Sequence, residues 1–345
     1  WDYSLLIKTA EYGHQRLSSE GNAYDQHISR HDRGMSMGDL ITMDDLTNEE
    51  ILQILSEANT LLPVARGDVY LPLLQGKVLG NLFFENSTRT RMSFETAMKR
   101  LGGEVINLSS VGSSVAKGET LYDTMQMVDG YTDIAVIRHP NQGAAQYSAD
   151  AVSIPILNAG DGAGNHPTQT MLDLFTIHEA HGSLEGLNVM MVGDLRYGRT
   201  THSLSHALVR FGAKLTLVSP ESLKMPAEIV SDLKNHGADV NETEEMASSI
   251  SSADVIYMTR IQKERFPDED EYNKVAGVYK LDASDLSEAK TGMIVMHPLP
   301  RVSELRASVD STKHARYFEQ AFNGVPTRMA LLCRGLGIKV PKKVK

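Results

Sequence analysis

Short apolar runs alternate along the chain with stretches whose apolar residues recur at helical spacing. In the first half the runs are KVLGNLFF, EVINL, DIAVIRHP and IPILNAG, and in the second half NVMMVGD, KLTLVSP, DVIYMTR and MIVMHPLP. Continuous apolar strands separated by helices are typical of parallel sheets that are covered on both faces. The pattern therefore predicts an α/β protein with two doubly wound domains, each with a sheet of about four parallel strands.

Polar and glycine-rich stretches follow most of these predicted strands. They read ENSTRTR, RHP, NAGDGAGNHPTQ, GDLRYGRTTHS, TRIQKER and HPLPR. Ligands of doubly wound sheets bind beyond the carboxyl ends of the strands. We therefore expect one cleft between the two domains to collect these stretches and to form the active site. Ahead of the first strand, TNEEILQILSEANTLL predicts a helix that begins with a capping box of Thr47 and Glu50.

The stretch STRTR concentrates donors where a strand leads into a helix. Ser87, Thr88 and Thr90 carry hydroxyl groups, and Arg89 carries a planar guanidinium that suits a phosphate. Free backbone N–H groups and the positive end of the helix dipole also favour an anion at this position. The pattern indicates a phosphate cradle, although a capped helix with surface ion pairs would give the same spacing.

Composition narrows the classes of partner. The 345 residues carry a formal net charge of −10, which argues against nucleic acid or an anionic membrane as the main partner. No apolar run approaches the roughly 20 residues that span a bilayer. Cys333 is the only cysteine, so no internal disulfide forms and a reducing compartment, the cytoplasm, is expected. The chain begins at Trp1 rather than Met, which leaves open a removed organelle-targeting peptide.

Two rival kinds of site are weakly supported. His202 and His206 have the i, i+4 spacing of zinc ligands on one helix face, but neither an H-E-x-x-H motif nor a cysteine cluster accompanies them. No G-x-G-x-x-G follows any predicted strand, which argues against a dinucleotide-binding enzyme. The motifs therefore predict neither a zinc site nor a dinucleotide cofactor.

Taken together and in order, seven motifs resemble those of the aspartate carbamoyltransferases. They are FFENSTRTRMSFE, AKGET, RHP, NAGDGAGNHPTQTMLDLFT, VGDLRYGRTTHSL, YMTRIQKERF and HPLPR, and the resemblance runs from about residue 38 to about residue 338. Ornithine-specific relatives typically carry HCLP where this chain has HPLP, so the ornithine type is the weaker alternative. A non-catalytic homologue that binds carbamoyl phosphate as a scaffold is a second alternative.

The resemblance implies a reaction and a domain plan. The α-amino group of L-aspartate would attack the carbonyl carbon of carbamoyl phosphate, giving N-carbamoyl-L-aspartate and phosphate for pyrimidine synthesis. The resemblance implies a reaction that needs no metal ion and no organic cofactor. Residues 39–166 with 324–345 would form the carbamoyl-phosphate domain, and 167–323 the aspartate domain. A C-terminal helix over about 326–338 would return to the first domain. Residues 1–38 would be an N-terminal extension, to which we assign no chemistry.

The resemblance also assigns the site residues. Those implied for carbamoyl phosphate are Ser87, Thr88, Arg89, Thr90, Ser113, Lys117, Arg138, His166, Gln169, Pro298, Leu299 and Pro300, of which Arg89, Thr90, Lys117, Arg138 and His166 would act in catalysis. Those implied for aspartate are Lys117, Arg199, Thr200, Arg260 and Gln262. Glu85 would pair with Arg199 and Arg265 when the domains close. Ser113 and Lys117 would reach a neighbouring subunit's site in a homotrimer, and a regulatory or multifunctional partner of the trimer is left open.

Overall fold

The described part of the chain contains two parallel β-sheets. This computed structural model describes residues 38–109, 118–162, 164–261, 266 and 269–344. Residues Met37–Lys345 form one compact unit. Sheet A has the strand order β2-β1-β3-β4 and sheet B the order β7-β6-β5-β8-β9, with every pairing parallel. In each sheet the chain moves outward from a central strand, returns and continues on the other side. The predicted α/β class with two doubly wound sheets is confirmed.

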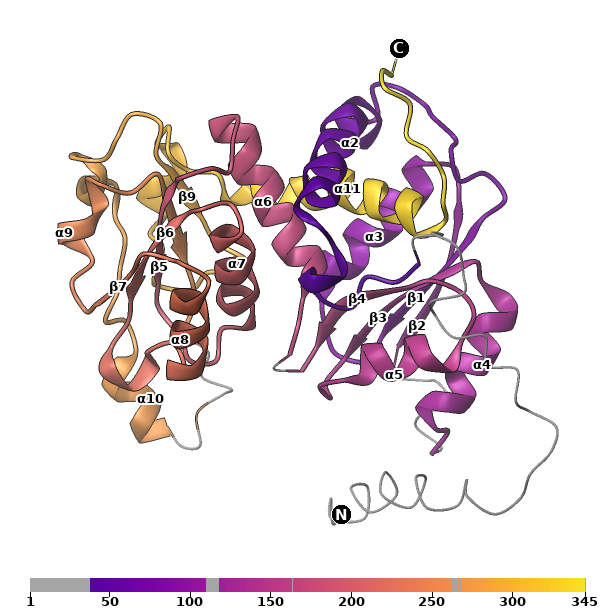
Figure 1. The fold of residues 1–345 in the computed structure, drawn as a ribbon, viewed down its shortest axis with the longest axis horizontal. Helices are drawn as coiled ribbons and strands as arrows, with labels where there is room; N and C mark the ends of the chain where they lie inside the picture. The colour runs from indigo at the N-terminus through magenta and orange to yellow at the C-terminus, as the bar shows by residue number, and fades with distance from the viewer. Residues whose placement is uncertain (1–37, 110–117, 163, 262–265, 267–268, 345) are drawn as a thin grey trace. The chain divides into compact units, whose positions relative to one another are not determined.

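Strands β1, β3 and β4 of sheet A are covered on both faces, as their continuous apolar runs require. The run EVINL also predicted a buried strand, but β2, which it forms at the sheet edge, is mostly exposed. Side chains alternate: Ile134 and Val136 join a core with α2, α3 and α11, while Ala135 and Ile137 join a core with α4 and α5 (Figure 1). The capping box at Thr47 is present at the start of α2. The elements of this half are α2 (Asn48–Arg66), β1 (Val78–Phe83), α3 (Thr88–Arg100), β2 (Glu104–Ser109), α4 (Leu121–Tyr131), β3 (Ile134–His139), α5 (Ala144–Ala151) and β4 (Ile156–Asp161), after the 3-10 turn η2 (Met43–Asp45).

Sheet B has five strands rather than the predicted four. The strand that the apolar pattern missed is β7, which lies at the sheet edge, is mostly exposed and contains a single apolar residue, Val240. Strand β7 buries little of its surface, and its sequence carries no apolar run. The elements are α6 (Pro167–His181), β5 (Asn188–Val192), α7 (Arg199–Val209), β6 (Lys214–Val218), η4 (Glu221–Leu223), α8 (Ala227–Asn235), β7 (Val240–Thr243), α9 (Ala247–Ile250), β8 (Val255–Met258), α10 (Glu269–Val275), η6 (Ala283–Leu286), β9 (Ile294–Met296) and η7 (Ala307–Ser311).

The last helix returns to the first half of the chain, as expected. Helix α11 (Tyr317–Gly335) packs against α2, α3 and α6 (Figure 1). It begins nine residues earlier than the expected 326, because Pro326 lies inside the helix instead of starting it. Through α6 and α11, one apolar cluster joins side chains of both sheets, including Val136 of β3 and Met191 of β5.

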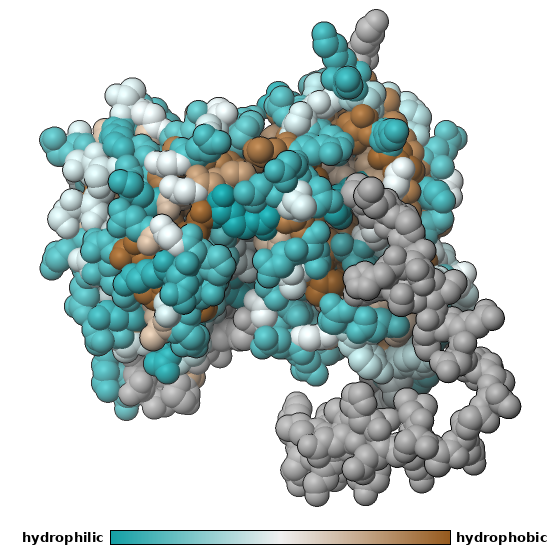
Figure 2. Space-filling model, viewed as in Figure 1, coloured by the Kyte–Doolittle hydropathy of each residue, from teal (hydrophilic) through white to brown (hydrophobic). Residues whose placement is uncertain are grey.

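Hydrophilic side chains cover most of the face shown in Figure 2, with smaller hydrophobic areas between them. Among the described residues, no helix combines the length and the apolar composition that crossing a membrane would require.

Candidate active site

A cleft of about 680 Å³ opens where both sheets reverse their strand order. In sheet A the reversal lies between β1 and β3, which are followed by Glu85 and end near Arg138. In sheet B it lies between β5 and β8, which are followed by Arg199 and Arg260. All four side chains line the cleft. The cleft thus lies at the carboxyl ends of the strands, where the strand-end rule predicted it, and both switch points contribute to its lining.

Three helices begin at the cleft with positive ends that no side chain caps. Helix α3 begins after Ser87, α6 after His166 and α7 after Gly198, and none of these three residues makes a side-chain capping bond. None of the helices has an acidic residue in its first turn. Uncapped N–H groups and three convergent helix dipoles produce a positive potential. The cleft is therefore built to receive anions.

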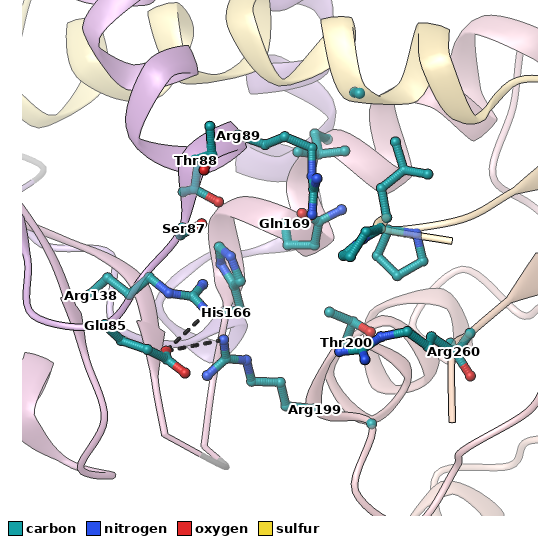
Figure 3. A pocket seen from close by; sticks show the side chains of 18 of the residues that line it. Glu85, Ser87, Thr88, Arg89, Arg138, His166, Gln169, Arg199, Thr200 and Arg260 are labelled. Carbon is teal, nitrogen blue, oxygen red and sulfur yellow. Dashed lines mark ion pairs between the residues drawn. The ribbon is translucent and has the colours of Figure 1, made fainter. Parts of the chain in front are cut away.

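Arginines add to this positive potential. Five of them line the cleft, against a single carboxylate, Glu85, among the described lining residues. The arginines are Arg89, Arg138, Arg199, Arg260 and Arg328. Figure 3 shows those that it labels approaching from different sides. With His neutral, the formal charge of the lining is 5 − 1 = +4. This suits substrates that bring several negative charges.

Glu85 links two of these arginines. Its Oε2 lies 3.0 Å from Nη2 of Arg138 and 3.7 Å from Nη2 of Arg199 (Figure 3). The pair with Arg138 differs from the expectation, which named Arg199 and Arg265. Gly160 leaves room for the arginines, since a Cβ there would lie 3.0 Å from Arg138 Nη1 and 3.1 Å from Arg199 Nη2. Arg265 lies outside the described residues.

His166 is buried and neutral. Its relative exposure is 4%, and burial, followed by the charges of Arg199, Arg138 and Arg328, holds its pKa well below the ordinary value. Its Nδ1 lies 3.5 Å from the hydroxyl of Thr168. A neutral imidazole carries its proton on one of its two ring nitrogens. The ring then offers a neutral N–H donor to a ligand.

The turn after β9 forms the opposite wall. Pro298, Leu299 and Pro300 line the cleft, and Leu299 adopts a left-handed φ of 57°. The ring of His297 holds this turn: its Nδ1 accepts the Leu299 N–H at 2.8 Å, and its Nε2 lies 2.8 Å from Glu304 Oε1. The imidazole therefore carries its proton on Nε2 and donates it to Glu304.

Of the predicted site residues, all those in the described part line the cleft. They are Glu85, Ser87, Thr88, Arg89, Thr90, Arg138, His166, Gln169, Arg199, Thr200, Arg260, Pro298, Leu299 and Pro300. Four predicted residues, Ser113, Lys117, Gln262 and Arg265, lie outside the described residues. Sequence reasoning missed Tyr197, Gln320 and Arg328. The charge of Arg328 inside the apolar stretch RMALLC was a signal for it.

The rival histidine pair does not converge. His202 Nε2 donates to the carbonyl of Leu195 at 2.7 Å, whereas His206 Nε2 lies 3.1 Å from Asp232. Among the described residues, no group of three His, Cys, Asp or Glu side chains could hold a metal ion.

Comparison with known proteins identifies the class to which this fold and cleft belong. Residues 38–179 match the model of the aspartate/ornithine carbamoyltransferase carbamoyl-P binding domain, and residues 185–334 match that of the Asp/Orn binding domain. The chain belongs to the aspartate/ornithine carbamoyltransferase family.

Similar proteins within this family are named for aspartate. The aspartate carbamoyltransferase catalytic subunit of Archaeoglobus fulgidus is 57% identical over 86% of this chain and 98% of its own. The solved catalytic subunit of the M. jannaschii aspartate transcarbamoylase is 48% identical with a TM-score of 0.82, covering 87% of this chain and 98% of its own. The Trypanosoma cruzi aspartate transcarbamoylase, solved with carbamoyl phosphate and aspartate, is 40% identical with a TM-score of 0.82, over 86% of this chain and 96% of its own.

Proposed function

We propose that this chain is an aspartate carbamoyltransferase, which transfers the carbamoyl group of carbamoyl phosphate to the α-amino group of L-aspartate in pyrimidine synthesis. The observation that carries the proposal is the cleft itself. It combines three uncapped helix N-termini with five arginines. It is lined from both segments that match the family's two binding domains. The substrates together bring one phosphate and two carboxylates.

The start of α3 is the proposed phosphate site. The backbone N–H groups of its first turn and the side chains of Ser87, Thr88 and Arg89 would hold the phosphate of carbamoyl phosphate. Ser87 supports this role because it is the N-cap residue yet makes no capping bond with its hydroxyl. The hydroxyl is therefore available to a ligand, and Arg89 supplies a planar set of donors.

Catalysis would be electrostatic. Attack by the amine builds negative charge on the carbonyl oxygen of carbamoyl phosphate. Thr90, Arg138 and His166 would donate to that oxygen, and donors fixed in advance stabilise such charge best. Arg138 is already held, since its Nη1 donates to the Ala159 carbonyl at 3.1 Å. His166 contributes as a neutral N–H donor, because its pKa is far below the ordinary value.

Aspartate would be held at the other end of the cleft. Arg199 and Arg260, helped by Thr200, would bind its two carboxylates, and Gln262 by motif position would assist. Glu85 lies between Arg138 and Arg199, so a carboxylate or carbonyl that binds these arginines must compete with it. We propose that Glu85 thereby couples substrate binding to closure of the cleft, together with Arg265.

The charge of the cleft favours aspartate over ornithine. The lining carries a formal charge of +4 among the described residues. Aspartate has two carboxylates, whereas ornithine would bring a second ammonium group into the same field. Like charges in a partly desolvated cleft repel. The ornithine alternative is therefore the weaker one.

A colorimetric assay for the carbamoylated product, run with aspartate and ornithine in parallel, tests the substrate. With carbamoyl phosphate present, we expect turnover of aspartate but not of ornithine. Turnover of ornithine but not of aspartate would overturn the proposal. Arg260→Ala should lower kcat/KM for aspartate by about 100-fold, since a charge-paired donor is removed. Arg196→Ala is the matched control: Arg196 is exposed, donates to the Ser222 carbonyl and does not line the cleft. Unchanged kcat/KM in Arg260→Ala would contradict its role.

We also propose a homotrimer with shared sites, in which Lys117 and Ser113 enter the neighbouring subunit's cleft. The support is the family resemblance of the stretch SSVAKGET. Inactive Lys117→Ala chains mixed with inactive Arg89→Ala chains should regain activity after dissociation and reassembly. Each mixed trimer then has one interface with both wild-type residues, so recovery should approach about a third of wild type. Zero recovery from trimers shown to be mixed would refute sharing.

The domain division is part of the proposal. Residues 39–166 with 324–345 would bind carbamoyl phosphate, and 167–323 would bind aspartate. The packing of α11 on α2 and α3 supports the return of the C-terminus. The proposed compartment is the cytoplasm, supported by the single, buried Cys333.

A further inference from the structure

A buried carboxylate lies behind the cleft. Asp173 is on α6, one helical turn after Gln169, and is 0% exposed. Its Oδ1 accepts from Nε2 of Gln169 at 2.9 Å and from Nε2 of Gln320 at 2.7 Å. Its Oδ2 accepts from the Tyr257 hydroxyl at 2.8 Å. One side chain thus joins α6, α11 and β8 behind the cleft.

This contact determines which way Gln169 faces. A carboxylate only accepts hydrogen bonds, so Gln169 must turn its NH2 group toward Asp173. The amide oxygen of Gln169 is then the atom left for a ligand in the cleft, which Gln169 lines. A carbonyl oxygen there can accept from an NH2 group but not from a methyl group. Asp173 therefore makes this position of the cleft an acceptor.

A second branch leads from Asp173 to the turn on the opposite wall. While Gln320 donates its Nε2–H to Asp173, its Oε1 accepts the backbone N–H of His297 at 2.8 Å. The ring of His297 accepts in turn from the N–H of Leu299. Both contacts use N–H groups of the turn, so they hold the backbone of the segment whose residues Pro298, Leu299 and Pro300 line the cleft and leave its carbonyl groups as acceptors for a ligand. The two acceptor surfaces thus share one anchor.

Arg328 provides charge for this anchor. Its guanidinium is buried at 2% exposure, with Cζ 4.9 Å from the centre of the Phe94 ring. The pKa of Asp173 is raised to about 7, because the effect of burial outweighs the lowering by its hydrogen bonds with Gln320, Tyr257 and Gln169 and by the positive charge of Arg328. Asp173 in turn raises the pKa of Arg328, against its own burial. A buried carboxylate with three donors and a nearby cation is a fully engaged anchor.

We propose that Asp173 is a positioning residue that makes the cleft recognise the NH2 group of the carbamoyl donor, and so selects carbamoyl phosphate over acetyl phosphate. The inference rests on the proposed function. The two donors differ in one group, since acetyl phosphate has a methyl where carbamoyl phosphate has NH2. With acetyl phosphate, the Gln169 oxygen and the turn carbonyls lose their donors. Sites built to hydrogen-bond a substrate group reject the analogue that lacks it.

The test compares the two phosphates on the full-length enzyme. The ratio of kcat/KM for carbamoyl phosphate to kcat/KM for acetyl phosphate is measured at saturating aspartate. Where acetyl phosphate turns over too slowly, its Ki as a competitor of carbamoyl phosphate replaces the second value. Asp173→Asn keeps the volume but replaces one of the two acceptor oxygens by an NH2 group, so three donors are left with a single oxygen and the contacts that hold Gln169 and Gln320 are weakened. It should lower the ratio about tenfold, mainly through carbamoyl phosphate, because an acceptor for its NH2 is lost.

Tyr257→Phe is the matched control. It removes one bond to the same carboxylate, but from Oδ2, which contacts neither Gln169 nor Gln320. It should leave the ratio unchanged even where overall activity falls. A role for Asp173 in stability alone would lower both kcat/KM values equally, and an unmoved ratio in Asp173→Asn would overturn the inference.

A second variant covers the case in which Asp173→Asn does not fold. Gln320→Met breaks only the branch to the turn and should also lower the ratio; an unmoved ratio there would then refute the inference. Failure of the proposed function itself gives a different result, because wild-type enzyme would then not convert carbamoyl phosphate and aspartate at all. If the wild-type enzyme is active but the variants leave the ratio of the two kcat/KM values unchanged, only the role of Asp173 is rejected and the proposed function stands.

Discussion

His166 offers the sharpest test of electrostatic catalysis in the cleft. Replacing it by Ala removes one of three proposed donors to the carbonyl oxygen and leaves Thr90 and Arg138 in place. The donor acts on charge that develops during attack, so its loss should appear in kcat more than in KM for carbamoyl phosphate. Within the described part of the chain, the polar contact of the ring is with the Thr168 hydroxyl at 3.5 Å, which is too long to contribute much to the fold.

The expected magnitude follows from the type of donor. Removing one donor to a developing oxyanion costs roughly 100- to 1,000-fold in kcat, or about 2.7 to 4 kcal/mol. His166 is neutral, since burial and the charges of Arg199, Arg138 and Arg328 hold its pKa well below 6.5. A neutral donor forms weaker bonds than a charged one. We therefore expect the lower end, about 100-fold, for His166→Ala.

Its pH dependence separates this role from acid–base catalysis. A group whose pKa is well below 6.5 stays neutral from pH 6 to 9, so the ratio of wild-type to variant kcat should be constant over that range. The assay is steady-state kcat across that range with both substrates saturating. His166→Gln, whose NH2 reaches toward the Nε2 position, should recover part of the loss.

Two outcomes would refute this account of His166. The first is a change of the wild-type kcat with pH near pH 6.5 that disappears in His166→Ala, which would mean that the imidazole titrates during the reaction. The second is a higher KM with kcat unchanged, which would mean that His166 binds the ground state alone.

Three further predictions concern charge and capping. Glu85→Gln removes the carboxylate between Arg138 and Arg199, so inorganic phosphate should bind a few-fold more tightly by calorimetry, and weaker binding would contradict the pairing. The pKa of Asp173 is raised from 3.8 to about 7, so the folded state keeps this proton up to a higher pH than the unfolded state does. The free energy of unfolding of the wild type should therefore fall by about 4 kcal/mol in total as the pH rises between these two values. The Tm of Asp173→Asn relative to wild type should therefore rise from pH 5 to pH 8, and a flat difference would reject the shift. Thr47→Ala should cost about 1 kcal/mol of stability in denaturant titrations, because the hydroxyl caps the Glu50 N–H at 3.2 Å, and no loss would mean that this cap is not used.

Local pattern determined much of this protein. The capping box at Thr47, the helix that begins after Ser87 and the apolar strands of both sheets appear where the sequence places them. These features depend on neighbours within about four residues, which sequence spacing records directly. The strand-end rule then located the cleft, because the carboxyl ends of parallel strands share one edge. All site residues that the family resemblance implied and that the structure describes line this cleft.

Tertiary structure alone decided what stands behind that cleft. Gln320 reaches Asp173 across 147 positions of sequence, and the contact exists because α11 returns over α6. The helical spacing of apolar residues does not show which face of a returning helix meets the cleft, so the sequence analysis did not identify Gln320 and Arg328. The same holds for Glu85, whose partner Arg138 comes from a neighbouring strand end. Long-range packing selects such partners, since it brings together side chains whose spacing along the chain carries no signal.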